Sequence, residues 1–166
     1  MIIEGKVWKF GDDVDTDIII PARFLNKSDK QELAKNCFAD IRPNFKDMIT
    51  PGDIIVAGRN FGSGSSREHA PIAIKEAGIS VIIAESFARI FYRNAFNIGL
   101  PIMESPELPN SIREGGYLSV NLSTGEISIK DTDKRFFSKP IPDFMREIVE
   151  AGGLVEYISK KGSTNK

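Results

Sequence analysis

Residues 53–69 read Asp53-Ile-Ile-Val-Ala-Gly-Arg-Asn-Phe-Gly-Ser-Gly-Ser-Ser-Arg-Glu-His69, and this stretch decides the fold. The four residues after Asp53 form an apolar run rich in β-branched side chains, which predicts a short buried strand. A glycine-rich loop follows, and then a helix-prone segment that Gly78 should end. Pro71 lacks a backbone N–H and is tolerated only in a first helical turn, so regular helix should begin near His69 or Ala70. The stretch therefore predicts a strand, a loop and a helix, with hydroxyl groups near the helix start.

The same pattern continues along the chain. Residues 80–84 are a second apolar run, residues 86–97 have helical spacing of apolar side chains, and residues 100–103 return to strand. Strands that alternate with helices in this way predict a parallel sheet with right-handed crossovers. We therefore expect an α/β fold in which a mainly parallel sheet is flanked by helices.

The flanking segments add further elements to this sheet. A β-prone opening predicts a first strand over residues 2–10, followed by an acidic loop over residues 12–17. Ser28-Asp-Lys-Gln31 matches a capping box, which predicts a helix that runs to about Phe38. Two further elements are an accessory antiparallel hairpin of residues 117–122 and 126–130 and an amphipathic helix over residues 142–151.

Length and charge limit the class of protein. The chain has 166 residues, which fits one domain, and we place that domain at residues 1–161 with a disordered polar tail at 162–166. Lys and Arg total 22 against 23 Asp and Glu, so no net field favours nucleic acid or an anionic membrane. Any anion must therefore be bound by a local cluster of groups.

The apolar runs and the few metal-binding side chains exclude other classes. No apolar run approaches the ~18 residues that a membrane span needs, and no signal-peptide pattern opens the sequence, which predicts a cytoplasmic protein. Cys37 is the single cysteine and His69 the single histidine. These two residues cannot build a closed zinc or iron–sulfur site, so another chain must supply any metal.

The glycine-rich loop is the candidate site. Its backbone N–H groups can converge on an anion beside a helix start, and Arg59 and Arg67 flank it. Because a planar guanidinium binds a carboxylate with two hydrogen bonds, carboxylate ligands fit best. A plain turn with Ser65 or Ser66 as helix cap would explain the serines but not the clustered arginines.

Two other readings of this loop fail. A nucleotide-binding P-loop needs a lysine after its last glycine, but Gly64 is followed directly by Ser65. A hydrolase nucleophile elbow needs Gly-x-Ser-x-Gly, which the loop lacks. His69 lies four residues after Ser65, but a triad requires a third group to orient the histidine, so we assign His69 a structural role.

The helix over residues 86–97 contributes two more cations, Arg89 and Arg93, on a polar stripe. Such a stripe is commonly solvated surface. It also adds to a local excess of positive charge in a nearly neutral chain. Whether Arg89 and Arg93 reach the site stays open at this stage.

Three motifs resemble one known family. They are the run from Phe61 to Ala70, Ser86-Phe-Ala-Arg-Ile-Phe-Tyr-Arg-Asn94, and Asp13-Val-Asp-Thr-Asp-Ile-Ile-Ile-Pro21. In this order they resemble the swivelling domain of the aconitase superfamily, most closely the free-standing small subunits of the 3-isopropylmalate dehydratase family. The resemblance spans nearly the whole chain and implies a single swivelling-type β/β/α domain. Ser63 departs from it, because many relatives have cysteine there.

The resemblance implies a hydro-lyase whose active site is shared between two chains. A large partner subunit would carry a 4Fe–4S cluster with one open iron, which accepts the leaving hydroxyl as a Lewis acid. In that family the serine matching Ser65 is the base that removes a proton from carbon. The residues matching Ser66 and Arg67 bind substrate carboxylate. The implied reaction converts 2-isopropylmalate to 3-isopropylmalate by dehydration and rehydration in leucine biosynthesis.

The resemblance also suggests which loop selects the substrate. Residues 21–28 would face the variable substituent, with Arg23 and Asn26 as candidate binding residues, and homoaconitase-type relatives tend to have arginine at the position of Asn26. An uncharged Asn26 favours an isopropyl group, although Arg23 and Lys27 keep a second carboxylate open. Homoaconitate, citramalate and dimethylmalate therefore stay as alternative substrates. A non-catalytic carboxylate-binding module is the alternative of another class, and the isolated chain is compatible with a homo-oligomer.

Overall fold

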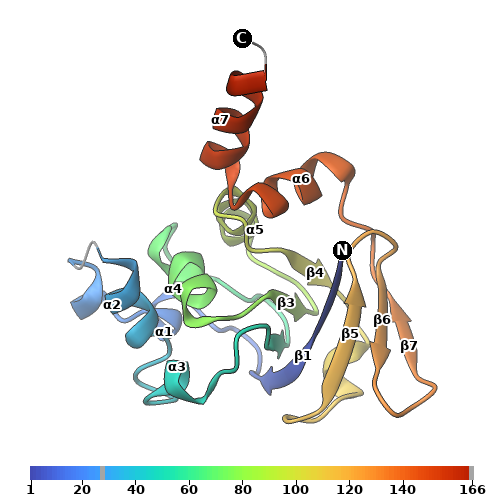
Figure 1. Cartoon of the computed structure of the whole chain (residues 1–166). Coiled ribbons are helices and arrows are strands. Elements are labelled where there is room, and N and C mark those ends of the chain that lie inside the picture. The colour runs from blue at the N-terminus through green and yellow to red at the C-terminus, as the bar shows by residue number, and fades with distance from the viewer. Residues whose placement is uncertain (27–28, 165–166) are drawn as a thin grey trace.

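A seven-stranded sheet in the order β4-β3-β2-β1-β5-β6-β7 is the framework of the computed structural model, which describes residues 1–26 and 29–164 (Figure 1). Four of its strands are parallel and form one half: β1 (Ile2–Lys9), β2 (Ile54–Ala57), β3 (Val81–Ala84) and β4 (Ile102–Glu104). Val7 lies opposite Ile54, which in turn lies opposite Val81. The predicted parallel sheet is confirmed.

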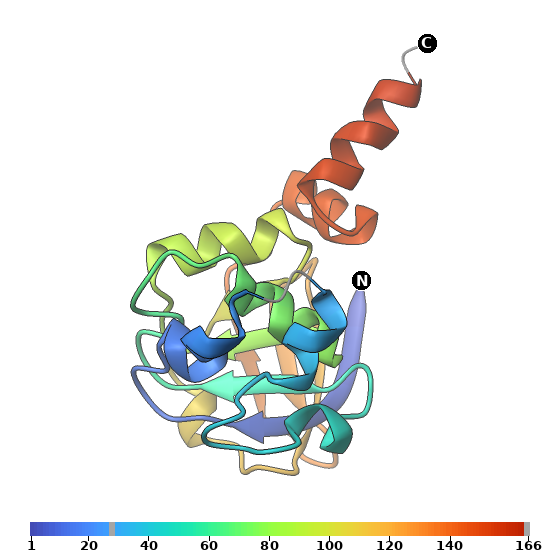
Figure 2. The same ribbon diagram turned by 90° about the vertical axis from the view of Figure 1, so that its left-hand side faces the viewer.

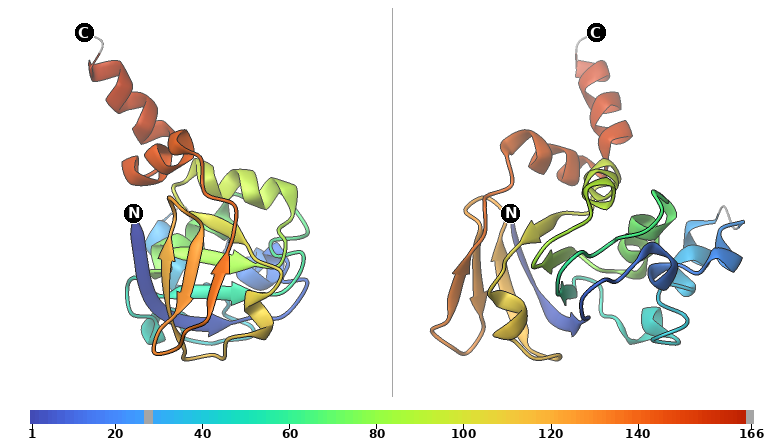
Figure 3. Two further views of the ribbon diagram at one scale, coloured as in Figure 1. Left: turned by 90° about the vertical axis from the view of Figure 1, so that its right-hand side faces the viewer. Right: turned by 180° about the vertical axis from the view of Figure 1, so that it is seen from behind.

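The other half of the sheet is antiparallel. β1 also pairs with β5 (Tyr117–Asn121), which continues into β6 (Glu126–Ile129) and β7 (Arg135–Phe137). The predicted hairpin is therefore present, and β1 joins it to the parallel strands in one sheet. Figure 3 shows this half curling away from the parallel strands. The antiparallel half is larger than predicted because β7 adds a strand and β1 uses both of its edges.

One helix connects β2 to β3 and another connects β3 to β4. The sequence predicted the first residue of one of them correctly and that of the other incorrectly. α4 (His69–Ala77) begins at the predicted residue and ends at Gly78, whose φ of 116° is left-handed. α5 (Arg89–Asn97) begins three residues later than predicted. A contact with a distant segment causes the delay: Phe61 N donates to Ser86 O and Ala88 N donates to Phe61 O, so residues 86–88 stay extended beside the glycine-rich loop.

Short elements fill the connection from β1 to β2. They are α1 (Thr16–Ile19), η1 (Ala22–Phe24), α2 (Lys30–Lys35) and α3 (Phe45–Met48). Gln31 N donates to the carboxylate of Asp29, which caps α2, while Ser28 of the predicted capping box lies outside the described residues. α2 is shorter than predicted, and Phe38, where the sequence placed its end, has a left-handed φ of 56°.

The C-terminal part leaves the body of the molecule. η2 (Leu108–Asn110) follows β4, and α6 (Asp143–Ala151) follows β7 with Pro142 at its N-cap, as predicted. α7 (Leu154–Thr164) then projects outward, as Figure 2 and Figure 3 show. Residues 162–164 of the predicted tail belong to this helix, and residues 165–166 lie outside the described part.

The core lies on both faces of the parallel strands. All residues of β2 and β3 are buried, as a strand covered on both sides requires. One aromatic cluster under α2 and α3 comprises Trp8, Phe10, Phe38 and Phe45, and another beside α5 comprises Phe61, Phe87, Phe91, Tyr92 and Phe96. Among the helices that the structure describes, none has the length and apolar character to cross a membrane.

Candidate active site

The candidate site lies where the parallel strands end. β1, β2 and β3 point the same way in Figure 2, so the loops that follow them meet at one edge of the sheet. Thr16 N donates to Ser63 O at 2.8 Å, and Gly62 N donates to Val14 O at 2.7 Å. The acidic loop after β1 is therefore bonded directly to the glycine-rich loop after β2. Open parallel sheets bind their ligands at this edge.

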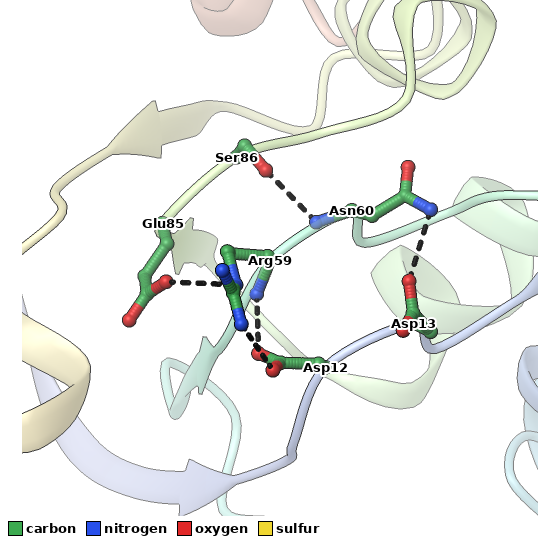
Figure 4. A network of polar contacts seen from close by, with 6 residues as sticks. All are labelled: Asp12, Asp13, Arg59, Asn60, Glu85 and Ser86. Carbon is green, nitrogen blue, oxygen red and sulfur yellow. Dashed lines mark hydrogen bonds and ion pairs between the residues drawn. The ribbon is translucent and has the colours of Figure 1, made fainter.

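A polar network holds the start of the glycine-rich loop (Figure 4). Arg59 N donates to the Asp12 carboxylate at 2.7 Å, and Asn60 Nδ2 donates to the Asp13 carboxylate at 3.1 Å. Ser86 Oγ accepts from Asn60 N at 2.9 Å. The hydrogen bond from the backbone N–H of Arg59 lowers the pKa of the Asp12 carboxyl; desolvation opposes it less strongly, and the charge of Arg59 adds a still smaller lowering. These residues brace the loop from the strand ends on either side.

Glycine is required inside the loop for steric reasons. Gly62 has φ of 82°, and a Cβ atom there would overlap the ring of Phe91. Gly64 has φ of 95°, and a Cβ atom there would lie 3.3 Å from Thr16 Oγ1. The loop backbone is therefore pressed against α5 on one side and against the start of α1 on the other.

Ser65 and Ser66 are exposed at the outer end of this loop, just before α4. Ser65 Oγ lies 3.3 Å from Thr16 Oγ1, and the hydroxyl of Thr16 is almost fully buried. Asn94, a buried residue of α5, donates from Nδ2 to Ser66 O at 3.3 Å. The two serines are thus held from α1 and from α5, with both hydroxyls on the outside.

Arg67 extends from the same loop to the first turn of α1. Its Nη1 donates to the Asp17 carboxylate in a salt bridge. About a quarter of the Arg67 side chain is exposed, and about two thirds of Asp17. The structure therefore brings Ser65, Ser66 and Arg67 together, and it adds Thr16 and Asp17 from the acidic loop.

The structure does not connect the other predicted residues to this group. Arg23 forms two hydrogen bonds with Asp40, at 3.1 and 2.5 Å, and these bonds lower the pKa of the Asp40 carboxyl. Asn26 is exposed in the turn after η1, and Lys27 and Ser28 lie outside the described residues. Within the described residues, no hydrogen bond or ion pair links Arg23 or Asn26 to Ser65, Ser66 or Arg67.

Arg89 and Arg93 are exposed on α5. Neither forms a hydrogen bond or an ion pair with another residue that the structure describes. Their guanidinium groups therefore face solvent on the helix that also supplies Asn94. His69, the first residue of α4, is half-buried and likewise has no hydrogen-bond partner in the described part of the chain.

Metal-binding groups do not gather at the site. In residues 1–26 and 29–164, no three His, Cys, Asp or Glu side chains are placed to hold an ion together. Cys37 is buried in the turn that follows α2, and burial raises the pKa of its thiol. The described residues of this chain therefore do not fit an iron–sulfur cluster.

A cavity of about 600 Å³ lies elsewhere, between β4, Tyr92 of α5 and the segment from β7 to α6. Its lining includes Glu85 and Glu104, and burial, followed by the charge of Glu104, raises the pKa of Tyr92. None of Ser65, Ser66 and Arg67 lines it. These three residues lie instead on the surface of the molecule, outside this cavity.

Thr16, Asp17 and Asn94 are the residues that the sequence did not single out. They lie in the two outer motifs, Asp13 to Pro21 and Ser86 to Asn94, but spacing along the chain gave no reason to prefer them over their neighbours. Their roles depend on contacts between segments that are far apart in sequence. Two pairs of side chains thus characterise the site. The hydroxyl of the exposed Ser65 lies beside that of the buried Thr16, and the guanidinium of Arg67 is paired with the exposed carboxylate of Asp17.

Comparisons with known proteins agree with this geometry. Residues 49–107, which include β2, the glycine-rich loop and β3, match the family model of the aconitase C-terminal domain. Curated 3-isopropylmalate dehydratase small subunits from Thermodesulfovibrio yellowstonii and Halothermothrix orenii are both 58% identical to the chain. The first alignment covers 97% of this chain and 96% of the relative, and the second covers 95% and 96%.

A solved structure extends the comparison to the fold. The crystal structure of a 3-isopropylmalate dehydratase from Methanocaldococcus jannaschii superimposes with a TM-score of 0.92 at 48% identity. The superposition covers 99% of this chain and 98% of that one. Both the sequence and the architecture thus match over essentially the full length, and the chain belongs to the family of 3-isopropylmalate dehydratase small subunits.

Proposed function

We propose that this chain is the small subunit of a two-subunit iron–sulfur hydro-lyase that interconverts 2-isopropylmalate and 3-isopropylmalate in leucine biosynthesis. One observation carries the proposal. The chain is 58% identical to curated small subunits over nearly its whole length, and its exposed Ser65 and Ser66 are followed directly by the half-buried Arg67. A cytoplasmic location fits this role.

The openness of the site supports a shared active centre. A serine hydroxyl is a very weak base in water, so an alkoxide needs hydrogen-bond donors and positive charge away from solvent. Ser65 is exposed in this chain, and the positive charge of Arg67 is matched by Asp17. A large subunit that covers this surface would exclude the water and complete the site.

The cluster belongs to that partner in our proposal, because the described residues of this chain do not fit one. When bound there, it would supply the Lewis acid that accepts the leaving hydroxyl. This chain would supply Ser65 as the base that takes the proton from carbon. Ser66 and Arg67 would hold a substrate carboxylate, and the guanidinium of Arg67 would exchange Asp17 for the substrate.

The loop after α1 would select the substituent of the substrate. Asn26 is uncharged and exposed, which favours an isopropyl group over a further carboxylate. Arg23 is already bonded to Asp40 through both Nη atoms, so a second carboxylate would have to displace Asp40. This ion pair favours isopropylmalate over homoaconitate.

The proposal is tested by anaerobic reconstitution with a cluster-bearing large subunit. Turnover of 2-isopropylmalate, 3-isopropylmalate, citramalate, dimethylmalate and homoaconitate is followed by the absorbance of the unsaturated acid. We expect activity on the isopropylmalates and little on homoaconitate. Carboxylate binding by this chain alone, without turnover in any pair, would instead favour a non-catalytic binding module.

Two variants assign roles within the active pair. We expect Ser65→Ala to lower kcat by at least about 10³-fold while the complex still assembles, because the base is lost. Arg67→Lys should raise KM about 10-fold or more, since a lysine cannot form the bidentate bond with a carboxylate. Retained activity in the first variant, or an unchanged KM in the second, contradicts the assigned role.

A further inference from the structure

Thr16 is the side chain in contact with the hydroxyl of the proposed base. It is the first residue of α1, and only 2% of its surface is exposed. Its Oγ1 lies 3.3 Å from Ser65 Oγ, and no other described residue forms a hydrogen bond with either oxygen. Buried polar groups need a hydrogen-bond partner, and the partner of the buried Thr16 hydroxyl is the hydroxyl of the exposed Ser65.

The backbone of Thr16 is fixed independently of this contact. Thr16 N donates to Ser63 O at 2.8 Å, and Thr16 O accepts from Ile20 N at 2.9 Å. The Asp15 carboxylate caps the turn by accepting from Ile18 N at 2.8 Å. The hydroxyl is therefore not needed to build α1 or to attach it to the loop, and it is available to act on Ser65.

The direction of the hydrogen bond depends on the state of Ser65. While Ser65 is a neutral hydroxyl, either oxygen can donate. Once Ser65 has lost its proton, its oxygen can only accept, so Thr16 must donate to it. A hydrogen bond to the charged form favours that form, and such bonds are shorter, about 2.5–2.7 Å for O–H···O⁻. The separation of 3.3 Å is that of the free chain, and catalytic hydrogen bonds often tighten when the complex forms.

The other candidate for this task is already engaged. Arg67 donates to Asp17, and no hydrogen bond joins it to Ser65 in the described residues. Gly64 lets the glycine-rich loop come close to α1, because a side chain at this position would crowd Thr16 Oγ1. The close approach of α1 to the loop, which backbone hydrogen bonds also hold, places the Thr16 hydroxyl beside that of Ser65.

We propose that Thr16 is a positioning residue for Ser65: its buried hydroxyl donates to Ser65 Oγ, fixes the orientation of that group and favours its deprotonated form. This inference rests on the proposed function, in which Ser65 is the base. It adds a residue of α1 to the group on the glycine-rich loop. Thr16 acts through Ser65 and makes no contact with the substrate.

The test compares Thr16→Ser with Thr16→Ala in the reconstituted pair. Both variants lack the methyl group, and only the second lacks the hydroxyl. We expect Thr16→Ser to retain kcat to within about 3-fold and Thr16→Ala to lose on the order of 10- to 100-fold, with KM changed by less than about 2-fold. In Thr16→Ala, the rise of kcat with pH should also move to higher pH, because the base is harder to deprotonate.

Thr16→Val, which keeps the volume of the side chain, separates the chemical effect from a packing defect. It should match Thr16→Ala in kcat and match the unmodified chain in urea midpoint and complex assembly. Thr132→Val is a matched control, since the Thr132 hydroxyl bonds only to local backbone in the turn after β6, where it donates to Ile129 O and accepts from Lys134 N.

The outcomes separate the two proposals. If the unmodified pair is active and Ser65→Ala is inactive, but both Thr16→Ala and Thr16→Val keep the normal kcat and pH profile, this inference is overturned and the proposed function stands. If Thr16→Ser is as impaired as Thr16→Ala, the hydroxyl is not the cause, and the inference also fails. An inactive unmodified pair, or an active Ser65→Ala, removes the base assignment on which both proposals depend.

Discussion

At the scale of single residues, the site depends on polar groups that are braced by the backbone of another segment. Asp12 accepts from the backbone N–H of Arg59, and Ser86 accepts from that of Asn60. Each bond attaches a side chain at the end of one strand to a loop. A preorganised site requires this kind of support, because a loop alone leaves its side chains poorly fixed.

Asp12 gives a prediction about pH. Its carboxyl has a lowered pKa, so the charged form stabilises the fold above the ordinary unfolded pKa of about 3.9, and this stabilisation is lost as the pH falls through the lower folded value. We expect Asp12→Asn to lower the free energy of unfolding at pH 6 and to converge with the unmodified chain in strong acid. Urea denaturation from pH 2 to pH 7 measures both effects.

The control is Asp133→Asn, which changes an exposed carboxyl that has no hydrogen bond or ion pair among the described residues. It should behave as the unmodified chain at every pH. A constant difference between Asp12→Asn and the unmodified chain across the whole range would show that the charge of Asp12 is not what stabilises the loop.

At the scale of elements, the sequence predicted what is local. The buried strands β2 and β3, the start of α4 at His69 and its end at Gly78 follow from apolar runs, proline and glycine. The start of α5 was wrong because residues 86–88 pair with Phe61, which is a contact between distant segments. The pairing of β1 with β5 was missed for the same reason, whereas β7 is a short strand that pairs locally with β6.

The candidate site divides in the same way. Ser65, Ser66 and Arg67 could be found from one continuous motif, and the structure places them together. Thr16, Asp17 and Asn94 come from other elements and were recognisable only after the loops were seen in contact. The role of Arg23 and Asn26 stays a prediction, because their loop includes the two residues outside the described part.

Lys75 on α4 gives a prediction about how the elements are joined. Its Nζ donates to Ile98 O at 2.7 Å and to Gly152 O at 3.0 Å, so one ammonium group binds the C-terminal ends of both α5 and α6. Cations are favoured at helix C-termini, where carbonyl groups are unpaired. We expect Lys75→Met, which keeps most of the side-chain stem, to lower the free energy of unfolding by about 2 kcal/mol.

Hydrogen exchange locates the effect of that change. Amides of α6 and α7 should exchange faster in Lys75→Met, while those of β2 and β3 stay protected. Lys35→Met is the matched control, because Lys35 is exposed at the end of α2 and its ammonium group forms no hydrogen bond or ion pair with another described residue. Unchanged exchange in α6 and α7 would mean that Lys75 does not hold these helices in place.

At the scale of the whole molecule, Cys37 offers a probe of unfolding. It is the single cysteine of the chain and is buried in the turn that follows α2, where burial raises the pKa of its thiol. Both effects oppose attack on a disulfide reagent, since only an accessible thiolate reacts. We expect negligible labelling by an aromatic disulfide at pH 8 without denaturant, and a labelling rate that rises with urea in parallel with the loss of Trp8 fluorescence.

Thr124→Cys provides the comparison within the same chain. Thr124 is exposed in the turn between β5 and β6, so a cysteine there should react within seconds under native conditions. Rapid labelling of Cys37 without urea would show that the region around α2 opens separately from the sheet.

The central position of β1 also has a consequence for biosynthesis. β1 lies between β2 and β5, yet both neighbours follow it along the chain, and Ile3 must wait for Val120 to be translated. β2 is translated well before β5, so the edge of a nascent β1 that pairs with β5 is the one that stays unpaired for longest, and an unpaired strand edge favours misassociation with other nascent chains. Ribosome-associated chaperones should therefore bind this polypeptide early and release it only after the hairpin of β5 and β6 has emerged.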